Sequence, residues 1–582
     1  MVKCNLLPVN NTDMGGREDW GPEVSLTVRK YALQNSIEYG GNGQEGSVLG
    51  RVLSEREDLR GQAKSLLELV KIEVERANRL FEEFGSGEVV SELKMIDPEA
   101  LQREKHQKSD GLKELPGETS EVVLRFAPNP NGPLTIGHSR GIVINSEYAG
   151  TYEGRVVLRF DDTDTRVKPP LLEAYQWIEE EYEWLSGRPP DVIIRASERM
   201  PIYLDYAEKM ISEGFGYVCR CSADNFKKFR ETKKDCPCRE REISESLNDW
   251  SEMISGNLSE GEAVVRVRTD MTLPNPALRD WPALRIQHTP HPIVGEEYKV
   301  WPLLDFQSAI EDHEQCVTHI IRGKDLMDST RKQTLLYEHF GWEYPETLYW
   351  GRVKIHEFGG FSTSGMVTSI ENGDYEGWDD PRLPTLKALR RRGFEAESVR
   401  DLWSDIGLTQ KDISVSMQTL ESFNSANIDT DCERRSFVED PVEICIISEY
   451  EGQNITIPRH PEGNVPGSRV WEFDAKVLIQ SSDLVDGKIR FKDFADVEIS
   501  GYEAVIESEE RTDERPIIHW LPRKMGTEAV ISAPNGEEII EKRGFIESFD
   551  LEVGSIYQLE RVGFARVEFI EEGIVRLLWL HK

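Results

Sequence analysis

The apolar residues of this chain recur in three different patterns along its length. In the first hundred residues they predict a helix over Glu55–Phe84, which Gly85 and Gly87 end. The residues on its apolar face are Leu66, Leu67, Val70, Val74, Ala77, Phe81 and Phe84. From about 119 to 345, β-branched runs alternate with amphipathic stretches, and beyond about 430 short alternating runs dominate. The pattern predicts helical, α/β and β regions in that order.

The α/β region begins with a βαβ unit, and its alternation is later interrupted. The predicted elements are a strand over Val122–Phe126, a helix after 135, a strand over Val156–Phe160, a helix over Leu171–Leu185 and a strand at Val192–Ile194. After a further helix ending near Gly214, the alternation resumes only with a strand over Val317–Arg322 and a helix from about Asp328 to Phe340. We therefore expect a doubly wound sheet split by an insertion of about a hundred residues.

The last 150 residues read as an all-β region. The predicted strands are Val442–Ser448, Val470–Phe473, Lys488–Phe491, Val497–Ile499, Ile517–Trp520, Ala529–Ser532, Arg566–Ile570 and Ile574–Leu580. Turn signals such as Asp486–Gly487 and Pro534–Asn535–Gly536 separate them. One or two β-barrels are expected here.

Length and composition bound the class of protein. A chain of 582 residues exceeds a single core. We expect the chain to divide into six structural segments, which span residues 1–118, 119–218, 219–300, 301–345, 346–429 and 430–582. The net charge of −36 by itself argues against a nucleic-acid partner, which needs lysine and arginine. No apolar run suits a membrane span, Met1–Asn10 lacks the features of a signal peptide, and eight cysteines are too few for a disulfide scaffold. We expect a soluble, cytoplasmic protein without membrane partners.

The turn after the first strand carries the most specific chemistry. It holds three prolines and two glycines, and it brings His138 and backbone N–H groups to a helix N-terminus, where phosphate is favoured. Arg125–Pro128 together with Leu134–His138 resembles the first signature of class I aminoacyl-tRNA synthetases of the glutamyl and glutaminyl branch, with Thr135 at the place of the first histidine. The resemblance implies that Thr135, Gly137 and His138 act on ATP. It also implies ATP contacts for Pro128, Asn129, Pro130, Asn131, Gly132, Pro133, Leu134 and Ile136.

The second signature of that family is a mobile loop whose lysine stabilises charge on the ATP phosphates. The matching stretch runs from Gly359 to Met366, and the downstream segment Gly377–Thr385 matches the family closely. The resemblance implies a catalytic role for Ser364 and ATP contacts for Ser362, Thr363 and Gly365. The lysine is missing, because Gly365 stands after Ser364 and no basic residue appears until Arg382. We expect slower activity or a positive charge from elsewhere, for example from Lys354 or Mg²⁺.

The choice of amino acid rests on two arginines. Glutamate needs a fixed cation for its side-chain carboxylate, and arginine binds carboxylate bidentately. The resemblance places Arg125 at that end of the pocket, Asp161 on the amine and Leu304 where many relatives have tyrosine. Arg322 matches the arginine of glutamyl enzymes, where the glutaminyl branch has a neutral residue. The alternative for Arg322 is a structural ion pair with Asp325 or Glu311.

Four cysteines form two close pairs, Cys219 with Cys221 and Cys236 with Cys238. Four thiolates in this arrangement are able to close a tetrahedral zinc site, and the alternative is a reduced cysteine cluster without metal. Residues 220–242 carry eight basic and five acidic side chains, so they are locally basic. We expect Lys227, Lys228, Lys233 and Lys234 to contact acceptor-stem phosphates, or else to form a solvated face.

A second basic stretch, Arg390–Arg391–Arg392, follows the signature loop. It indicates contact with the inner bend of a tRNA, with a solvated helix face as the alternative. The helical region before 119 and the β ending resemble archaeal-type glutamyl-tRNA synthetases, with an interrupted Rossmann-type catalytic domain and C-terminal anticodon-binding barrels. This implies attachment of glutamate to tRNA(Glu) with ATP and Mg²⁺, and a structural Zn²⁺. We expect a monomer. Whether tRNA(Gln) is also charged stays open, and the rival functions are a glutaminyl enzyme and a catalytically silent tRNA-binding relative.

Overall fold

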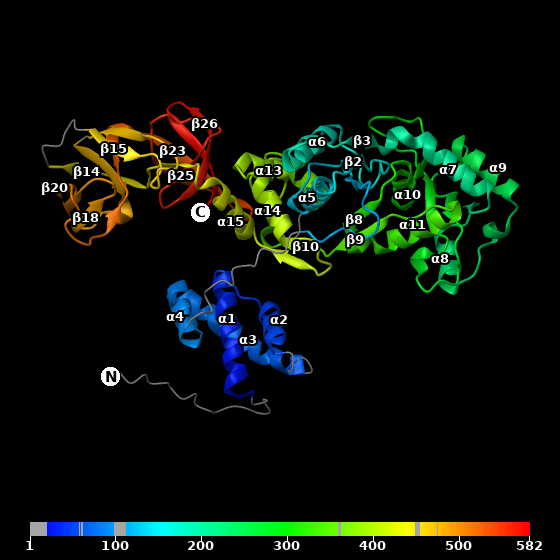
Figure 1. Cartoon of the computed structure of the whole chain (residues 1–582), viewed down its shortest axis with the longest axis horizontal. Coiled ribbons are helices and arrows are strands. Elements are labelled where there is room, and N and C mark those ends of the chain that lie inside the picture. Colours follow the sequence, from blue (N-terminus) through cyan, green and yellow to red (C-terminus); the bar gives the residue numbers. More distant parts are fainter. Residues whose placement is uncertain are drawn as a thin grey trace. The chain divides into compact units, whose positions relative to one another are not determined.

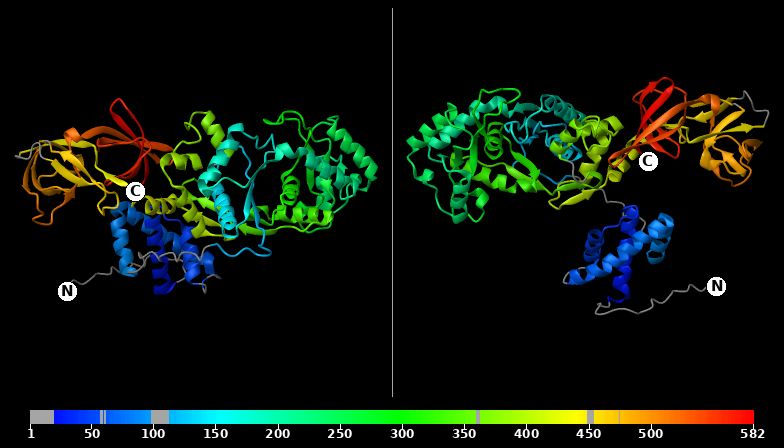
Figure 2. Two further views of the ribbon diagram at one scale, coloured as in Figure 1. Left: turned by 45° about the horizontal axis from the view of Figure 1, so that its top comes forward. Right: turned by 180° about the vertical axis from the view of Figure 1, so that it is seen from behind.

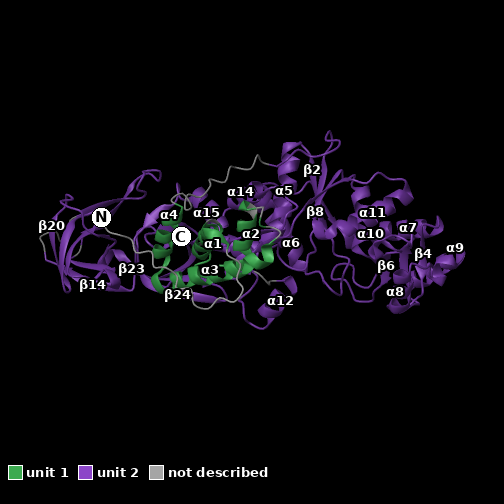
Figure 3. Ribbon diagram, turned by 90° about the horizontal axis from the view of Figure 1, so that it is seen from below, with its two compact units in different colours: residues 1–109 green, residues 110–582 purple. Residues whose placement is uncertain are grey.

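The computed structural model describes residues 20–56, 59, 62–97, 112–358, 362–447, 454–473 and 475–582. The chain divides into two compact units, Met1–Ser109 and Asp110–Lys582 (Figure 3). The described part of the first unit is helical, and the second unit combines an α/β region with C-terminal β-sheets (Figure 1). A membrane-crossing helix, which needs about 20 apolar residues, does not occur among the described residues.

The described part of the N-terminal unit packs four helices around one apolar core. They are α1 (Gly21–Glu38), α2 (Glu45–Glu55), α3 (Ala63–Phe84) and α4 (Ser86–Ile96). The single helix expected over Glu55–Phe84 was wrong at its start, because α2 ends at Glu55 and α3 begins at Ala63; its residues 57, 58, 60 and 61 lie outside the described residues. The buried stripe explains this, since it begins only at Leu66. Gly85, at φ +78°, ends α3 as expected.

The α/β region is built on parallel strands. β1 (Val123–Phe126), β2 (Arg155–Phe160) and β3 (Val192–Arg195) pair in that order. β8 (His319–Gly323) pairs in parallel with β9 (Glu346–Trp350), and it begins beside β1, where Thr318 donates its N–H to the Val123 carbonyl at 3.0 Å. The accompanying helices are α5 (Ile136–Thr151), α6 (Leu172–Ser186), α7 (Met200–Ser212), α10 (Leu304–Glu314) and α11 (Met327–Phe340). Figure 1 shows α5 and α6 beside these strands.

The predicted interruption of the sheet is present. Its strands form an antiparallel four-stranded sheet in chain order: β4 (Gly216–Cys219), β5 (Val264–Val267), β6 (Pro282–Ile286) and β7 (Val300–Pro302). The helices α8 (Ala223–Thr232) and α9 (Ile243–Ile254) lie within the same segment. The segment shares one apolar core with α7, α10 and α11. The inserted sheet is therefore anchored to helices that precede and follow it in the α/β region.

A mixed helical region follows β9. Its elements are β10 (Val353–Ile355), α12 (Thr363–Glu371), α13 (Leu386–Arg392), α14 (Ala396–Ile406), β11 (Ile413–Val415) and α15 (Met417–Ile428). β10 and β11 pair in parallel, and apolar residues of α13, α14 and α15 join the core that surrounds β1, β2, α5 and α6. The region therefore packs directly on the strands and helices that carry the first signature.

The C-terminal region is β-rich, as predicted. One seven-stranded sheet runs β12-β25-β26-β27-β23-β24-β13, another runs β21-β18-β19-β20-β14-β17-β22, and β15 pairs with β16. The two seven-stranded sheets are visible in Figure 2. The strands are β12 (Glu433–Arg435), β13 (Phe437–Glu439), β14 (Pro441–Ile446), β15 (Asn454–Pro458), β16 (Ser468–Glu472), β17 (Lys476–Gln480), β18 (Gly487–Phe491), β19 (Asp496–Ser500), β20 (Glu503–Ser508), β21 (Ile517–Ile518), β22 (Leu521–Pro522), β23 (Gly526–Asn535), β24 (Glu538–Glu547), β25 (Ile556–Leu559), β26 (Gly563–Glu571) and β27 (Ile574–His581). The expected turn at Gly536, at φ +62°, joins β23 to β24.

Candidate functional site

The first signature lies in the turn between β1 and α5. Thr135 is the N-cap residue of α5, and its backbone N–H donates to His138 Nδ1 at 3.2 Å. The turn is tied down on both sides: Leu134 N–H donates to Glu181 Oε2 at 2.8 Å, and Ile136 N–H donates to the Pro384 carbonyl at 3.0 Å. The backbone of the turn is therefore fixed before any ligand binds.

The second signature lies against the first. A Cβ at Gly132 would come within 2.9 Å of Thr363 Cγ2 and 3.1 Å of Trp378 Cη2, so only glycine permits this approach. Ser362 caps α12 and accepts the Gly365 N–H at 3.1 Å. The predicted loop residues 359–361 lie outside the described residues. The structure brings Gly132 of the first signature against Thr363 of the second, beside a helix N-terminus that favours phosphate.

The cations nearest to the second signature differ in their availability to a phosphate. Arg382 is engaged by Asp380, with Nε to Oδ1 at 2.9 Å and Nη2 to Oδ2 at 2.7 Å. Lys354 is exposed on β10. A third cation is Lys168: desolvation lowers the pKa of His138 most, and the charge of Lys168 lowers it further. Lys168 pairs with no carboxylate of the described residues, which leaves it available to an anion.

The segment that carries Lys168 is attached to the first signature at both of its ends. Asp161 donates its backbone N–H to the Pro128 carbonyl at 3.0 Å, and Leu171 donates to the Pro130 carbonyl at 2.8 Å. Lys168 stands three residues before the second of these bonds. Sequence reasoning did not select it, because a single lysine in a loop carries no motif.

Three arginines from three strands converge on one buried carboxylate. Arg125, Arg159 and Arg322 occupy the penultimate positions of β1, β2 and β8. Asp312 of α10, whose side chain is 0% exposed, lies 2.7 Å from Arg159 Nη1, 3.4 Å from Arg125 Nε and 3.9 Å from Arg322 Nη2. Because the β1 and β2 arginines differ by two register positions, they point to the same face of the sheet.

This arginine cluster carries more positive than negative charge. Asp161 adds a second carboxylate, whose Oδ1 accepts from Arg159 Nε at 2.8 Å and from Gln307 Nε2 at 2.9 Å. Within the described part of the chain, the Arg125 guanidinium donates no hydrogen bond, and Arg322 donates one, to Gln333 Oε1 at 3.0 Å. Three guanidinium groups against two carboxylates leave one positive charge and several buried N–H groups for a ligand anion.

The ionisation states of the cluster follow from burial and from these pairs. Burial lowers the pKa of Arg125 to about 10, so it stays charged at neutral pH. Burial opposes ionisation of Asp312, but Arg159, Arg125 and Arg322 together hold the pKa of Asp312 below its ordinary value. Arg125 and Asp312 are therefore both charged at pH 7.

The ion-pair neighbour of Arg322 differs from the two carboxylates named as its structural alternative. Its carboxylate neighbour is Asp312, not Asp325 or Glu311. Glu311 is taken by Arg199 Nε at 2.5 Å and by Tyr203 OH at 2.8 Å. Leu304 is at the start of α10 with 47% of its surface exposed.

Sequence reasoning missed the partners that α10 and α11 supply. They are Gln307 and Asp312 on α10, Gln333 on α11, and Tyr344, which donates to Gln333 Oε1 at 2.7 Å. The available signal was a polar stripe on α10, since Gln307, Ser308, Glu311 and Asp312 recur at helical spacing and are all buried. A buried polar stripe on a helix indicates a polar site rather than a solvated face.

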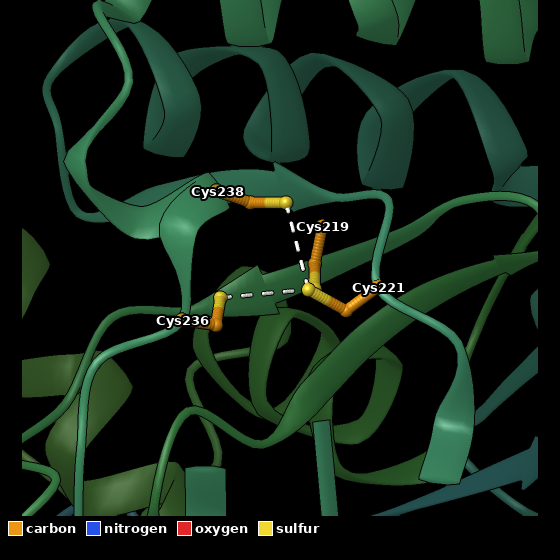
Figure 4. Close-up of side chains that lie close together, drawn as sticks. All are labelled: Cys219, Cys221, Cys236 and Cys238. Carbon is orange, nitrogen blue, oxygen red and sulfur yellow. Dashed lines mark hydrogen bonds between the residues drawn. The ribbon is translucent and has the colours of Figure 1, made fainter. Parts of the chain in front are cut away.

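The four cysteines meet as predicted (Figure 4). Cys219 ends β4, and Cys236 and Cys238 flank Pro237 beyond α8, where a short 3-10 helix (Pro237–Glu240) begins. All four Sγ atoms lie within 4.8 Å of one another, with Cys221 and Cys238 at 3.8 Å and Cys219 and Cys236 at 4.0 Å. Four ligands at about 2.3 Å from a tetrahedral zinc ion would be about 3.8 Å apart. The thiols are free and mostly buried, so the donor set fits this metal.

The predicted basic residues differ in exposure. Lys227, Lys228, Lys233 and Lys234 are exposed on α8 and just beyond it. Arg390 is exposed on α13, whereas Arg391 Nε pairs with Glu568 at 2.7 Å. The expectation for Arg392 was wrong, because its side chain is buried and donates to the Leu580 carbonyl at 2.6 Å. Arg392 fixes β27 to α13 and is not available to a tRNA phosphate.

The chain matches two family models. Residues 121–430 match "tRNA synthetases class I (E and Q), catalytic domain", and residues 432–513 match "tRNA synthetases class I (E and Q), anti-codon binding domain". The chain is 43% identical to a glutamate–tRNA ligase of Methanosarcina mazei, over 96% of this chain and 99% of that protein. It is 45% identical to one of Archaeoglobus fulgidus (94% and 98%) and 41% identical to one of Pyrococcus furiosus (96% and 100%). Signature geometry and full-length similarity agree: this chain belongs to the class I aminoacyl-tRNA synthetases of the glutamate and glutamine branch.

Proposed function

We propose that the protein is a glutamate–tRNA ligase, which attaches glutamate to tRNA(Glu) through glutamyl-adenylate. The observation that carries the proposal is the uncompensated positive charge at Arg125 and Arg322, beside Asp312. A glutamate side-chain carboxylate supplies the missing charge and acceptors, whereas the amide of glutamine supplies no charge and presents N–H groups to other N–H groups. The relatives named above bear the same activity in their names.

The first step forms the adenylate. Arg125 and Arg322 bind the side-chain carboxylate of glutamate, and Asp161 accepts from its ammonium group. The α-carboxylate oxygen then attacks the α-phosphorus of ATP, the bond to the bridging oxygen of the β-phosphate breaks, and diphosphate leaves with that electron pair. Thr135, Gly137, His138 and the N-terminus of α12 at Ser364 position and stabilise the ATP phosphates, which carry Mg²⁺ in this class of enzyme.

The second step transfers the glutamyl group. The terminal ribose hydroxyl of the tRNA attacks the carbonyl carbon, the carbon–oxygen bond to phosphate breaks, and AMP leaves while the hydroxyl proton is released. Exposed lysines of α8 neutralise acceptor-stem phosphates. The β-rich C-terminal region binds the anticodon, in keeping with the family model that matches it. We propose that the enzyme acts in the cytoplasm, where its substrates tRNA and ATP are found, and that it is a monomer.

Charging assays test the proposal directly. Purified tRNA(Glu) and tRNA(Gln) are incubated with Mg-ATP and either radiolabelled glutamate or radiolabelled glutamine, and acid-precipitable label is counted. We expect glutamate on tRNA(Glu). Glutamate on tRNA(Gln) as well would identify a non-discriminating enzyme. Glutamine on tRNA(Gln) alone would establish the glutaminyl rival, and tight tRNA binding without any charging would establish the silent relative.

Zinc at the four cysteines stabilises the inserted sheet. We expect the purified protein to contain about one zinc per chain, because four thiolates at tetrahedral separations bind Zn²⁺ tightly. Cys238→Ser should lose the metal and lower the thermal midpoint of the protein. The measurement is metal analysis by mass spectrometry together with a melting curve, with Cys316→Ser, an exposed cysteine outside the cluster, as the control. Full stability of the metal-free protein would contradict a structural role.

Lys168 supplies positive charge that the second signature loop lacks. We expect Lys168→Gln to lower the rate of ATP–diphosphate exchange about tenfold while the KM for glutamate stays within twofold, because the charge acts on phosphate and not on the amino acid. Arg166→Gln on the same loop is the matched control, since its guanidinium pairs with Glu260 at 3.3 Å. Equal rates in the two variants would show that Lys168 has no part in the reaction.

A further inference from the structure

A second pocket, of about 550 Å³, lies behind the first signature. Its walls come from α6, from the segment before α13, from α13 and from β26. Trp177 and Trp378 supply two aromatic surfaces, and Lys387 and Arg390 supply cations. None of these four residues binds glutamate or ATP in the mechanism above, so the pocket is a separate site.

Four basic side chains line this pocket: Arg391 is paired with Glu568 at 2.7 Å, whereas Lys387 and Arg390 have no such partner. Lys387 Nζ lies 4.0 Å from the centroid of the Trp177 ring, and Arg390 Cζ lies 5.4 Å from that of Trp184. Neither forms an ion pair with a carboxylate of the described residues, although Glu180 and Asp379 lie at the rim. In a chain with a net charge of −36, a pair of cations left without carboxylates is ready for an external anion.

A buried carboxyl group completes the pocket. Glu181 is 0% exposed, its Oε2 accepts the Leu134 N–H at 2.8 Å, and its Oε1 is buried without a hydrogen-bond partner. Burial raises the pKa of Glu181 to about 8, so the group is largely protonated at neutral pH. With Oε2 already bonded to Leu134, the protonated group keeps one unused polar atom, Oε1, in the wall of the pocket.

The pocket contacts the first signature at two points. One is the bond from Leu134 to Glu181. The other is Trp378, whose ring touches Gly132 and whose carbonyl accepts from Thr385 Oγ1 at 2.6 Å. A ligand that moves Glu181 or Trp378 therefore acts on the backbone that holds ATP.

We propose that this pocket binds one nucleotide unit, with its base against Trp177 and Trp378 and its phosphate between Lys387 and Arg390. The proposal rests on the proposed function in one respect, namely that tRNA is the source of the nucleotide. A free nucleoside monophosphate has the same chemistry, and the experiment separates the two sources. Tryptophan stacking and arginine or lysine on phosphate are the usual elements of such recognition.

The test measures binding of a tRNA(Glu) transcript to the full chain by filter retention at several salt concentrations. We expect Lys387→Gln/Arg390→Gln to weaken binding about tenfold and to reduce the slope of log K against log salt by about 1. Trp177→Leu keeps both cations and should also weaken binding, by about fivefold or more, through loss of stacking. Lys71→Gln, which removes an exposed lysine of the other compact unit, is the control and should bind as the parent does. A melting curve for each variant identifies any that is unfolded.

Hydrogen exchange at the Leu134 amide reports occupancy of the pocket. Saturating tRNA should slow this exchange in the parent protein and leave it unchanged in Trp177→Leu. The same slowing by a mixture of the four nucleoside 5′-monophosphates, without tRNA, would assign the pocket to free nucleotides. Parent-like tRNA affinity in both pocket variants, with no monophosphate effect, would overturn the proposal. Charging by the parent protein is scored separately, so a failure of the ligase function is distinguishable from a failure of the pocket.

Discussion

Arg322→Gln is expected to lower kcat/KM for glutamate by about 10²- to 10³-fold, because a buried carboxylate loses one of the two guanidinium groups that bind it. ATP–diphosphate exchange in the presence of tRNA measures this. The KM for ATP should change little, since Arg322 contacts Gln333 and Asp312 and not the signature turn.

The control for this prediction is Arg331→Gln. Arg331 is on α11, is 56% exposed and pairs with Asp328 at 3.2 Å, so its replacement should leave kcat/KM within twofold. If Arg322→Gln retained parent-like kcat/KM for glutamate, the excess charge of the cluster would have another role.

Asp312→Asn is expected to have the largest effect on stability. The substitution leaves Arg125, Arg159 and Arg322 buried with only Asp161 to compensate them, and uncompensated buried charge costs about 3–5 kcal/mol of unfolding free energy. Urea denaturation followed by tryptophan fluorescence measures the loss. Asp325→Asn, an exposed carboxylate near the end of β8, is the control and should change the free energy of unfolding by less than about 0.5 kcal/mol.

The Asp312 carboxylate should also make the free energy of unfolding depend on pH. Because the pKa of Asp312 is lowered in the folded protein, its contribution is present above the unfolded value of about 3.9 and is lost as pH falls through the folded value. The parent should therefore lose stability on acidification more steeply than Asp312→Asn. Identical acid profiles would show that Asp312 is not held ionised by the arginines.

The sequence was most informative where short, rigid motifs carry the chemistry. The turn from Arg125 to His138 and the two cysteine pairs were predictable because their function depends on local spacing, and the structure brings each set together. The strand–helix alternation likewise predicted the interrupted sheet, since periodicity and β-branched runs are local signals.

The features that were not predictable depend on distant partners. In the sequence, Asp312 is only one polar residue of a helix. The fold places the arginines of β1, β2 and β8 against it. Arg392 reads as a surface residue because its partner, the Leu580 carbonyl, comes from a strand 188 residues later. Glu181 belongs to an acidic run on α6, and only the fold shows that it is buried under Leu134. Such contacts follow from tertiary packing, which a single sequence does not display.

The central claim is that the arginine cluster selects a carboxylate over an amide. The most direct measurement compares glutamate and glutamine as substrates in tRNA-dependent ATP–diphosphate exchange by the parent protein. Because an amide leaves the buried charge unpaired, at a cost of about 3–5 kcal/mol, kcat/KM for glutamate should exceed that for glutamine by more than about a hundredfold. Equal use of the two amino acids, or a preference for glutamine, would contradict the account.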